Sequence, residues 1–475
     1  MESLIQMTAL QVVNLLRKRE ISPLELVEAS ARRIAETDKS VNAIPVLCLE
    51  RARKHARALQ NRTAADIGPR DLLGLPVAVK DNLDVKGVPT THGSLVYAAA
   101  KPASKSDLVV ERLEQNGAIV MGKSNLPEFA CGANSFNEVF GVTRNPWDLT
   151  KTAGGSSGGA AAALASGQVW LATGNDFAGS IRIPASFCSI VGFRPSPGRL
   201  PRLQKQPFSP FSIEGTMARN VADAALMYDA EVGWHPLDPL TQPTPECRYL
   251  DAALSPRAPV RIGYSSDLGV APALDKEVRD ICNAAIEKLA VAGVATESAN
   301  ISLKDAAKHF ETLRAAIYVG RVGHLLQAYR HLIKPEVVEN AEYGFGLTVA
   351  QVVAAEAGHG EVVQNTAKFF ESYDILASPA FLTPAFPAED RYLQRVEETT
   401  FDNHLSSLVL TYSITMTCCP SICVPCGFTS TGLPVGLQLV GRPRGEYDLF
   451  TAAAFAEQVF GVAEVTPIDP RPARS

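Results

Sequence analysis

The spacing of hydrophobic residues predicts a chain in which helices and strands alternate. In residues 8–19 apolar side chains recur every three to four positions, which is the period of a helix with one buried face. The pattern starts again after Ser22-Pro23, a helix-start signal. Short, continuously apolar runs are typical of buried strands. The first expected helices are 8–19, 22–37, 47–60 and 105–116, and the first expected strands are 77–79 and 118–123.

This alternation is the mark of an α/β fold. Residues 154–167 are rich in glycine and then in alanine, which favours a loop followed by a closely packed helix. Residues 236–260 are rich in proline and polar residues, so we expect a long surface connection there, and we expect the tail from Pro467 to be frayed. A strand–helix–strand unit at 261–298 and strands within ILASPA, SICVPCGF and VGLQLVG complete the pattern.

Composition narrows the class of protein. The 475 residues are 46 % hydrophobic and 20 % charged with a formal net charge of −5, which excludes a disordered chain and gives no positive field for nucleic acid. The nine cysteines are odd in number and irregularly spaced, so we expect a reduced, cytoplasmic protein. The sequence has no run of about 18 apolar residues and no signal-peptide pattern, so no membrane partner is expected.

Three short motif matches are better explained as structure. Gly117–Ser124 fits a phosphate-binding loop, but its middle residues are apolar and favour a buried strand. Cys419, Cys423 and Cys426 have the spacing of a cluster-binding triplet, but they surround a short apolar strand. Gly154–Gly158 contains G-x-S-x-G without the apolar strand that a nucleophile elbow needs. No histidine pair has zinc-site spacing, so we expect no metal and no other cofactor.

A fourth match is much longer. GGSSGG at 154–159 is followed by GNDFAGSIRIPASFCSIVGFRPSPGR at 174–199, and GLPVAVKDNLDVKGVPTTHGS precedes both at 74–94. These segments resemble the amidase signature family, and 122–148, 214–225 and 432–443 extend the resemblance. It implies a single amidase domain over 1–475 with an α/β/α fold, in which a large mixed β-sheet is flanked by helices. The signature core would span about 74–200 and a variable, substrate-shaping region about 300–400.

Amide hydrolysis needs an activated nucleophile, a proton donor for the leaving nitrogen, and hydrogen-bond donors for the oxyanion. The family resemblance assigns the nucleophile, which forms an acyl-enzyme, to Ser180. The turn before it is made of small residues and can present successive backbone N–H groups to a negative oxygen. By resemblance the oxyanion hole would be formed by the N–H groups of Phe177, Ala178, Gly179 and Ser180.

The resemblance implies two further catalytic residues, Lys80 and Ser156. Lys80 ends an apolar run, and burial would lower its pKa enough for a general base near neutral pH. Ser156 lies 24 positions before Ser180, the spacing of the family, and would carry a cis peptide bond and relay a proton between lysine and nucleophile. Arg182 is expected to pair with Asp176 and hold the turn. The residues expected to support the site are Asp81, Asn82, Ser157, Asp176 and Arg182.

Two residues depart from the family pattern. Ala178 replaces a usual glycine, and its methyl group should narrow the oxyanion hole or restrict φ there. Asn175 replaces a usual threonine or serine. The resemblance implies a small-molecule amide as substrate, with aryl amides and carbamates (urethanes) in the same class. The scarcity of charge near the motifs favours an uncharged substrate.

Two other functions are compatible with these residues. One is the glutaminase (A-type) subunit of a tRNA-dependent amidotransferase, which shares the signature, although residues 200–215 do not look like the tyrosine-containing run that we expect in such subunits. The other is an inactive binding protein with the signature fold, against which the intact Lys80, Ser156 and Ser180 argue. A hydrolase that acts alone is expected to be a monomer or a homodimer.

Overall fold

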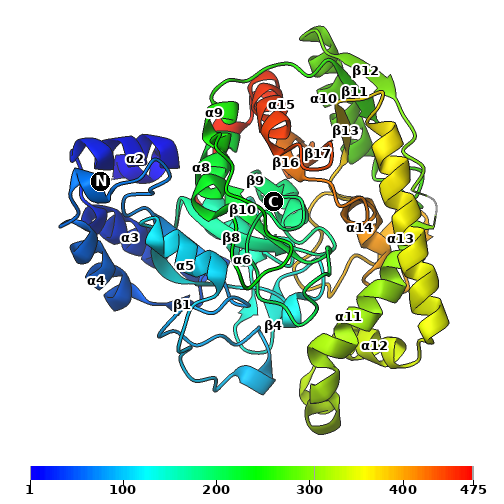
Figure 1. Ribbon diagram of the computed structural model, residues 1–475, viewed down its shortest axis with the longest axis horizontal. Helices are drawn as coiled ribbons and strands as arrows, with labels where there is room; N and C mark the ends of the chain where they lie inside the picture. The colour runs from blue at the N-terminus through cyan, green and yellow to red at the C-terminus, as the bar shows by residue number, and fades with distance from the viewer. Residues whose placement is uncertain (1, 304, 473–475) are drawn as a thin grey trace.

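The computed structural model describes residues 2–303 and 305–472, and an eleven-stranded mixed sheet runs through its centre (Figure 1). The strands lie across the sheet in the order β1 (Val46–Leu47), β3 (Ile119–Ser124), β2 (Pro76–Lys80), β8 (Leu171–Asp176), β10 (Ile213–Ala218), β9 (Val191–Arg194), β16 (Ser421–Phe428), β17 (Pro434–Gly441), β13 (Ile375–Pro379), β11 (Arg261–Tyr264) and β12 (Ala295–Ser298).

Parallel and antiparallel pairs both occur in this sheet, so the expected mixed sheet is confirmed. β2 runs parallel to both β3 and β8, and β10 then pairs antiparallel with β8 and β9. β16 and β17 lie far from β9 along the chain, yet in the sheet they occupy the two positions between β9 and β13. The segment that fits a phosphate-binding loop contains β3, and all six residues of that strand are buried. Small two-stranded sheets join β4 (Phe136–Asn137) to β5 (Gly141–Val142), β6 (Arg144–Asn145) to β7 (Asp148–Thr152), and β14 (Arg395–Val396) to β15 (Thr399–Thr400).

Helices cover both faces of the sheet and enclose two hydrophobic cores. Val77 and Val79 of β2 belong to one core and Ala78 to the other, because successive side chains of a strand point to opposite faces. The core with Ala78 is covered by α3 (Pro23–Val41), α4 (Leu49–Leu59), α6 (Gly158–Ala165) and α7 (Arg182–Cys188). The core with the two valines is covered by α1 (Glu2–Gln6), α2 (Ala9–Lys18), α5 (Leu108–Gln115), α8 (Val221–Glu231), α9 (Tyr249–Ala253), α10 (Lys276–Val291) and α15 (Glu446–Phe460).

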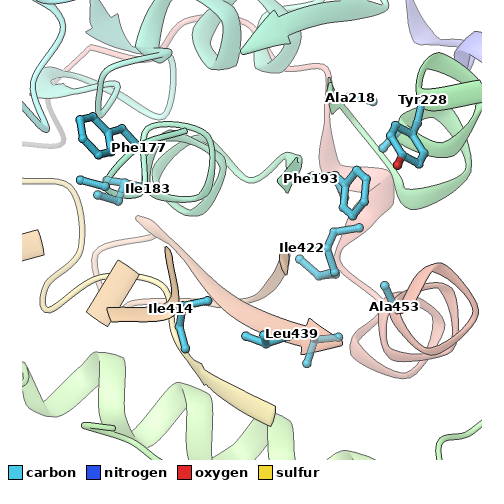
Figure 2. Packing of buried hydrophobic residues seen from close by; sticks show 14 of the residues in the cluster. Phe177, Ile183, Phe193, Ala218, Tyr228, Ile414, Ile422, Leu439 and Ala453 are labelled. Atoms are coloured by element: carbon cyan, nitrogen blue, oxygen red, sulfur yellow. The ribbon is translucent and has the colours of Figure 1, made fainter. Parts of the chain in front are cut away.

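Aromatic and aliphatic side chains from distant parts of the chain meet in the core that contains the two valines. Figure 2 shows Phe193 of β9 beside Ile422 of β16, with Tyr228 of α8 and Ala453 of α15 close by. The Phe193 and Tyr228 rings meet edge to face with their centroids 4.9 Å apart. Full burial of one such side chain contributes about 1.5–3 kcal/mol to folding. The same core therefore joins strands from the signature segment to strands near the C-terminus.

Three helices occupy the region between residues 300 and 400 at one edge of the molecule, and the first of them packs against the other two (Figure 1). They are α11 (Ala306–Tyr329), α12 (Pro335–Phe345) and α13 (Val349–Phe369), and α11 also packs on α14 (Val409–Thr415). In the described ranges, none of the helices combines the length and apolar character that crossing a membrane would require.

One expectation about irregular segments holds for most of its length, and the other is wrong. Residues 236–248 and 254–260 form a connection without helix or strand, and only the short buried helix α9 interrupts it; the first two N–H groups of α9, those of Tyr249 and Leu250, donate to the Asp229 carboxylate at 2.9 Å each. The tail beyond Pro467 is anchored as far as residue 472, because the Ile468 N–H donates to a carbonyl of α6 at 2.8 Å and its carbonyl accepts from Arg33 at 2.9 Å. Buried backbone groups need such partners, and polar composition does not reveal where they are.

Candidate active site

Lys80 is the last residue of β2, and its side chain is completely enclosed. Its Nζ donates to the hydroxyls of Ser156 at 2.7 Å and Ser157 at 2.8 Å, and to Oδ1 of Asn175 at 2.6 Å. An ammonium group has three N–H donors, so these acceptors satisfy all of them. A neutral amine would keep two donors and present its lone pair to one of the two serine hydroxyls.

Burial lowers the pKa of Lys80 to about 7 from an ordinary value of 10.5. The charges of Glu214 and Asp176 oppose this shift, and that of Arg321 adds to it. Glu214 lies directly opposite Asn175 in the β8–β10 pair, and burial raises the pKa of its carboxyl group. Near neutral pH a sizeable fraction of Lys80 is therefore uncharged and able to accept a proton.

Ser156 and Ser157 lie in the glycine-rich loop that leads into α6. The Gly155–Ser156 peptide bond is cis, and both serines are buried. The Ser157 N–H donates to the carbonyl of Ser180 at 3.0 Å, which joins this loop to the turn after β8. We expected Ser157 to act from outside the site, but its hydroxyl contacts Lys80 directly.

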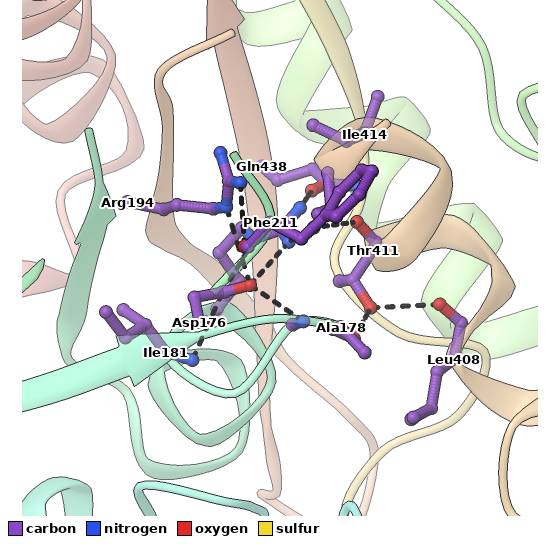
Figure 3. Close-up of polar contacts among 12 residues, drawn as sticks. Asp176, Ala178, Ile181, Arg194, Phe211, Leu408, Thr411, Ile414 and Gln438 are labelled. Carbon is purple, nitrogen blue, oxygen red and sulfur yellow. Dashed lines mark hydrogen bonds and ion pairs between the residues drawn. The ribbon is translucent and has the colours of Figure 1, made fainter. Parts of the chain in front are cut away.

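The turn of residues 177–180 links β8 to α7, and Asp176 holds it in place (Figure 3). The Asp176 carboxylate accepts the N–H of Gly179 at 2.9 Å and that of Ile181 at 3.2 Å. Gly179 has φ +109°, and a Cβ atom there would lie 2.3 Å from Oγ1 of Thr411. A side chain at this position would both clash and strain the backbone, so the turn requires glycine.

The backbone donors of this turn differ from the expected oxyanion hole at one position. The N–H of Gly179 points to Asp176, so we exclude it from the set. In the described part of the chain the N–H groups of Phe177, Ala178 and Ser180 donate to no protein group. Ala178 does not adopt a positive φ, so its methyl group is accommodated without strain. Its carbonyl accepts from the Thr411 hydroxyl at 2.6 Å.

A buried ion pair anchors the turn to the rest of the fold. Arg182 donates through Nε and Nη2 to the two oxygens of Asp176, at 3.0 and 2.9 Å, and Arg194 lies 3.7 Å away. Burial on its own raises the pKa of Asp176, but the two arginines outweigh it and lower this pKa to about 2. Arg182 also donates to Gln438 of β17 and Thr415 of α14 at 3.0 Å each.

The side chains of Asp81 and Asn82 form no hydrogen bond with Lys80, Ser156 or Ser180 among the described residues. Asp81 forms a fully buried ion pair with Lys123 at 2.9 Å, which gives the lysine of the phosphate-loop match a structural role. Asn82 lines a cavity of about 150 Å³ together with Arg202 and Glu214. Within residues 2–303 and 305–472 no protein group forms a hydrogen bond with its Oδ1.

Exposure distinguishes Ser180 from the two residues expected to work with it. Lys80 and Ser156 are 0 % exposed, whereas Ser180 is half-buried and can be reached from solvent. In the region that the structure describes, the Ser180 hydroxyl has no hydrogen-bond partner. Catalytic hydrogen bonds are often loose until substrate binds.

From the sequence we did not anticipate that Asn175 contacts Lys80 or that two arginines of α11 contact Phe177. Asn175 departs from the family pattern, and this departure was the sequence feature that could have drawn attention to it. Arg314 and Arg321 come from the region without recognisable motifs, yet their guanidinium carbons lie 5.9 and 5.6 Å from the ring centre of Phe177. Their spacing of seven residues places them on one face of a helix, which was the available signal. Within the described ranges no three metal-ligating side chains cluster as a metal ion would need.

The chain is similar to known proteins over most of its length. The family model described as Amidase matches residues 25–450. The A-type subunit of glutamyl-tRNA(Gln) amidotransferase from Geobacillus kaustophilus is 32 % identical, and the alignment covers 98 % of this chain and 100 % of that protein. An acylamidase from Rhodococcus erythropolis is 33 % identical over 98 % of both chains.

Solved structures resemble the whole molecule. The crystal structure of a bacterial aryl acylamidase of the amidase signature family superposes with a TM-score of 0.89 at 26 % identity and covers 97 % of this chain and 99 % of its own. The family match, the relatives and the shared fold all indicate the same family. The chain belongs to the amidase signature family, and it is an amidase-type hydrolase that acts on carbon–nitrogen bonds other than peptide bonds.

Proposed function

We propose that the chain hydrolyses small-molecule amides, aryl amides and carbamates among them, through a Ser180–Ser156–Lys80 triad and an acyl-enzyme. One observation carries this proposal: an enclosed lysine with a pKa of about 7 donates to Ser156 at 2.7 Å, beside a half-buried serine. In this proposal the whole chain works as one amidase domain and needs no cofactor. The signature core supplies the chemistry, and the helices between 300 and 400 shape the substrate site.

In the proposed reaction, neutral Lys80 accepts the proton of Ser156 as Ser156 accepts that of Ser180, and the Ser180 oxygen bonds to the substrate carbonyl carbon. The N–H groups of Phe177, Ala178 and Ser180 stabilise the resulting oxyanion. The proton then passes back through Ser156 to the substrate nitrogen as the C–N bond breaks. Water attacks the acyl-enzyme by the same proton route and restores Ser180.

The glutaminase function remains the second candidate, because the amidotransferase relative and the acylamidase are almost equally similar in sequence. Hydrolysis by the purified chain without other proteins separates the two functions. We expect turnover of acetanilides or phenyl carbamates in the absence of any partner protein, and labelling of Ser180 by a fluorophosphonate, located by peptide mass spectrometry. Glutamine hydrolysis that requires added amidotransferase partners would favour the second candidate, and an unlabelled Ser180 would contradict the triad.

The proposed role of Lys80 predicts a specific pH dependence. Because the uncharged amine is the base, kcat/KM should rise about tenfold per pH unit below pH 7 and level off above it. The Asn175→Asp variant places a carboxylate where an amide oxygen now lies 2.6 Å from Nζ, which should raise the pKa of Lys80 by roughly 1–3 units. The midpoint of its pH–rate profile should move to higher pH by the same amount. An unchanged midpoint would place the base elsewhere.

A further inference from the structure

One face of α11 brings two arginines and a tyrosine to the oxyanion turn. Arg314, Tyr318 and Arg321 follow each other at intervals of four and three residues, so they lie on the same side of the helix. The guanidinium carbons of the two arginines lie 4.3 and 5.5 Å from the ring centre of Tyr318, and both also face the ring of Phe177. Phe177 is the first residue of the turn that ends at Ser180.

Arg314 is enclosed, and within the described residues no carboxylate forms an ion pair with it. It is 3 % exposed and donates to the Tyr318 hydroxyl at 3.2 Å, to Cys131 at 3.4 Å and to Asn340, and it lies 3.5 Å from His404. In the described ranges its Nε has no hydrogen-bond partner, although it is buried. These contacts fix the orientation of the group, and Arg314 is among the charges that lower the pKa of the buried Cys131 thiol well below its usual range, so Cys131 compensates part of the charge of Arg314.

Arg321 is half-buried and is the more accessible of the two. Among residues 2–303 and 305–472, no group forms a hydrogen bond or an ion pair with it. Glu214 is the acid whose charge acts on it, and that carboxylate already lies 3.3 Å from Arg202. Cys131, which contacts Arg314, raises the pKa of that guanidinium more than Glu311 on the same helix does.

Burial of positive charge without a partner is unfavourable, and here several cations are close together. Burial lowers the pKa of Arg321, and the charges of Arg202 and Arg314 lower it further. Contact with aromatic rings offsets only part of the free energy that the loss of hydration costs these guanidinium groups. An anion that arrives with the substrate would remove this imbalance, and a guanidinium binds a carboxylate through two parallel hydrogen bonds.

We propose that Arg321 binds a carboxylate group of the substrate. Arg314 adds positive charge and holds Tyr318 in place. The preferred substrates are therefore amides that bear a carboxylate a few bonds from the scissile C–N bond. This inference rests on the proposed function and replaces the expectation of an uncharged substrate. The arginines act beside Phe177, at the opposite end of the turn from the nucleophile, so they select the substrate and take no part in the proton relay.

Two matched substrate pairs test this inference, one for each side of the scissile bond. On the acyl side, glutaryl p-nitroanilide is compared with pentanoyl p-nitroanilide. On the amine side, 4-acetamidobenzoate is compared with 4-methylacetanilide. In at least one pair we expect kcat/KM to be at least about tenfold higher for the carboxylate, since hydrogen bonds to charged groups have that effect.

The variant Arg321→Gln should lower kcat/KM for the favoured carboxylate substrate roughly 10- to 100-fold and change that of its neutral partner less than about threefold. Arg321→Lys should recover part of the loss, since it keeps the charge without the planar fork. Arg330→Gln is the matched control, because Arg330 follows α11 and pairs with the exposed Glu342, away from the turn. It should leave both substrates unaffected.

Ligand binding gives a readout that does not depend on turnover. Benzoate should raise the Tm of the wild-type chain more than benzyl alcohol, which has no bond to hydrolyse, and Arg321→Gln should abolish the difference. Equal effects of the two ligands on Tm, or equal losses for both members of each substrate pair, would overturn the inference. If Ser180 is labelled by a fluorophosphonate in that case, the proposed function stands without it. If Ser180 is not labelled but benzoate binding depends on Arg321, the carboxylate site stands and the triad fails.

Discussion

The Ser180→Ala variant is expected to lose hydrolysis almost completely while it keeps its fold. Removal of the nucleophile from a comparable serine hydrolase triad lowers kcat roughly 10⁶-fold. The alanine side chain fits the turn without strain, because Ser180 is not at a positive φ and its hydroxyl contacts no described group. The measurements are kcat with an anilide substrate and the Tm by calorimetry.

A double variant provides the control for this result. Residues that act as a unit give losses that do not add, so Ser180→Ala combined with Lys80→Met should be about as inactive as Ser180→Ala alone. If the Ser180→Ala enzyme kept more than about a tenth of the wild-type kcat at unchanged Tm, another residue would have to form the acyl-enzyme. A further tenfold loss in the double variant would mean that Lys80 also acts outside the proposed relay.

The second large effect is expected for Lys80→Met. Loss of the general base should lower kcat/KM at pH 8 by about 10²–10⁴-fold, since methionine fills a similar volume but cannot accept a proton. The comparison with an acetanilide substrate at pH 8 is informative because most of Lys80 is then uncharged in the wild-type enzyme. If Lys80→Met retained most of its activity, the base would lie elsewhere, and His92 and His404 would be the next residues to test.

The same variant should change the pH dependence of stability. The pKa of Lys80 is lower in the folded chain, about 7, than its ordinary value of 10.5, so between these values the unfolded chain binds more protons. The free energy of unfolding of the wild type should therefore rise with pH relative to that of Lys80→Met, by about 2 kcal/mol between pH 7 and pH 9. Urea unfolding at the two pH values measures this difference, and a constant difference would show that Lys80 is not desolvated.

Much of the fold follows from local patterns, and the exceptions have physical causes. Segments with a clear period, such as 8–19 and 22–37, became the helices α2 and α3, because their apolar stripes are long and their start signals are strong. Helix α9 escaped notice because five residues are too few to show a period. The tail after Pro467 is held by hydrogen bonds from its backbone to α6 and Arg33. The side chains of a segment do not reveal which of its backbone groups will be hydrogen-bonded, so the sequence could not predict this.

The site is predictable where the chemistry requires a residue type and unpredictable where distance in sequence hides a contact. Lys80 and Ser156 follow from motifs, and the structure places them within hydrogen-bond distance of each other. That the Gly179 N–H belongs to Asp176 depends on the orientation of one peptide unit, which no sequence pattern specifies. Arg321 comes from a segment without motifs, so its place beside Phe177 depends on how α11 packs.

The position of β16 and β17 in the middle of the sheet has a consequence for synthesis. When the ribosome has made the first 400 residues, β9 still lacks one of its two neighbours, because both strands that complete the sheet are yet to come. An unpaired apolar edge in a nascent chain invites aggregation and is a natural target for chaperones. The Gln438 side chain that supports Arg182 also arrives last, so truncated products would lack support for the turn that carries the nucleophile.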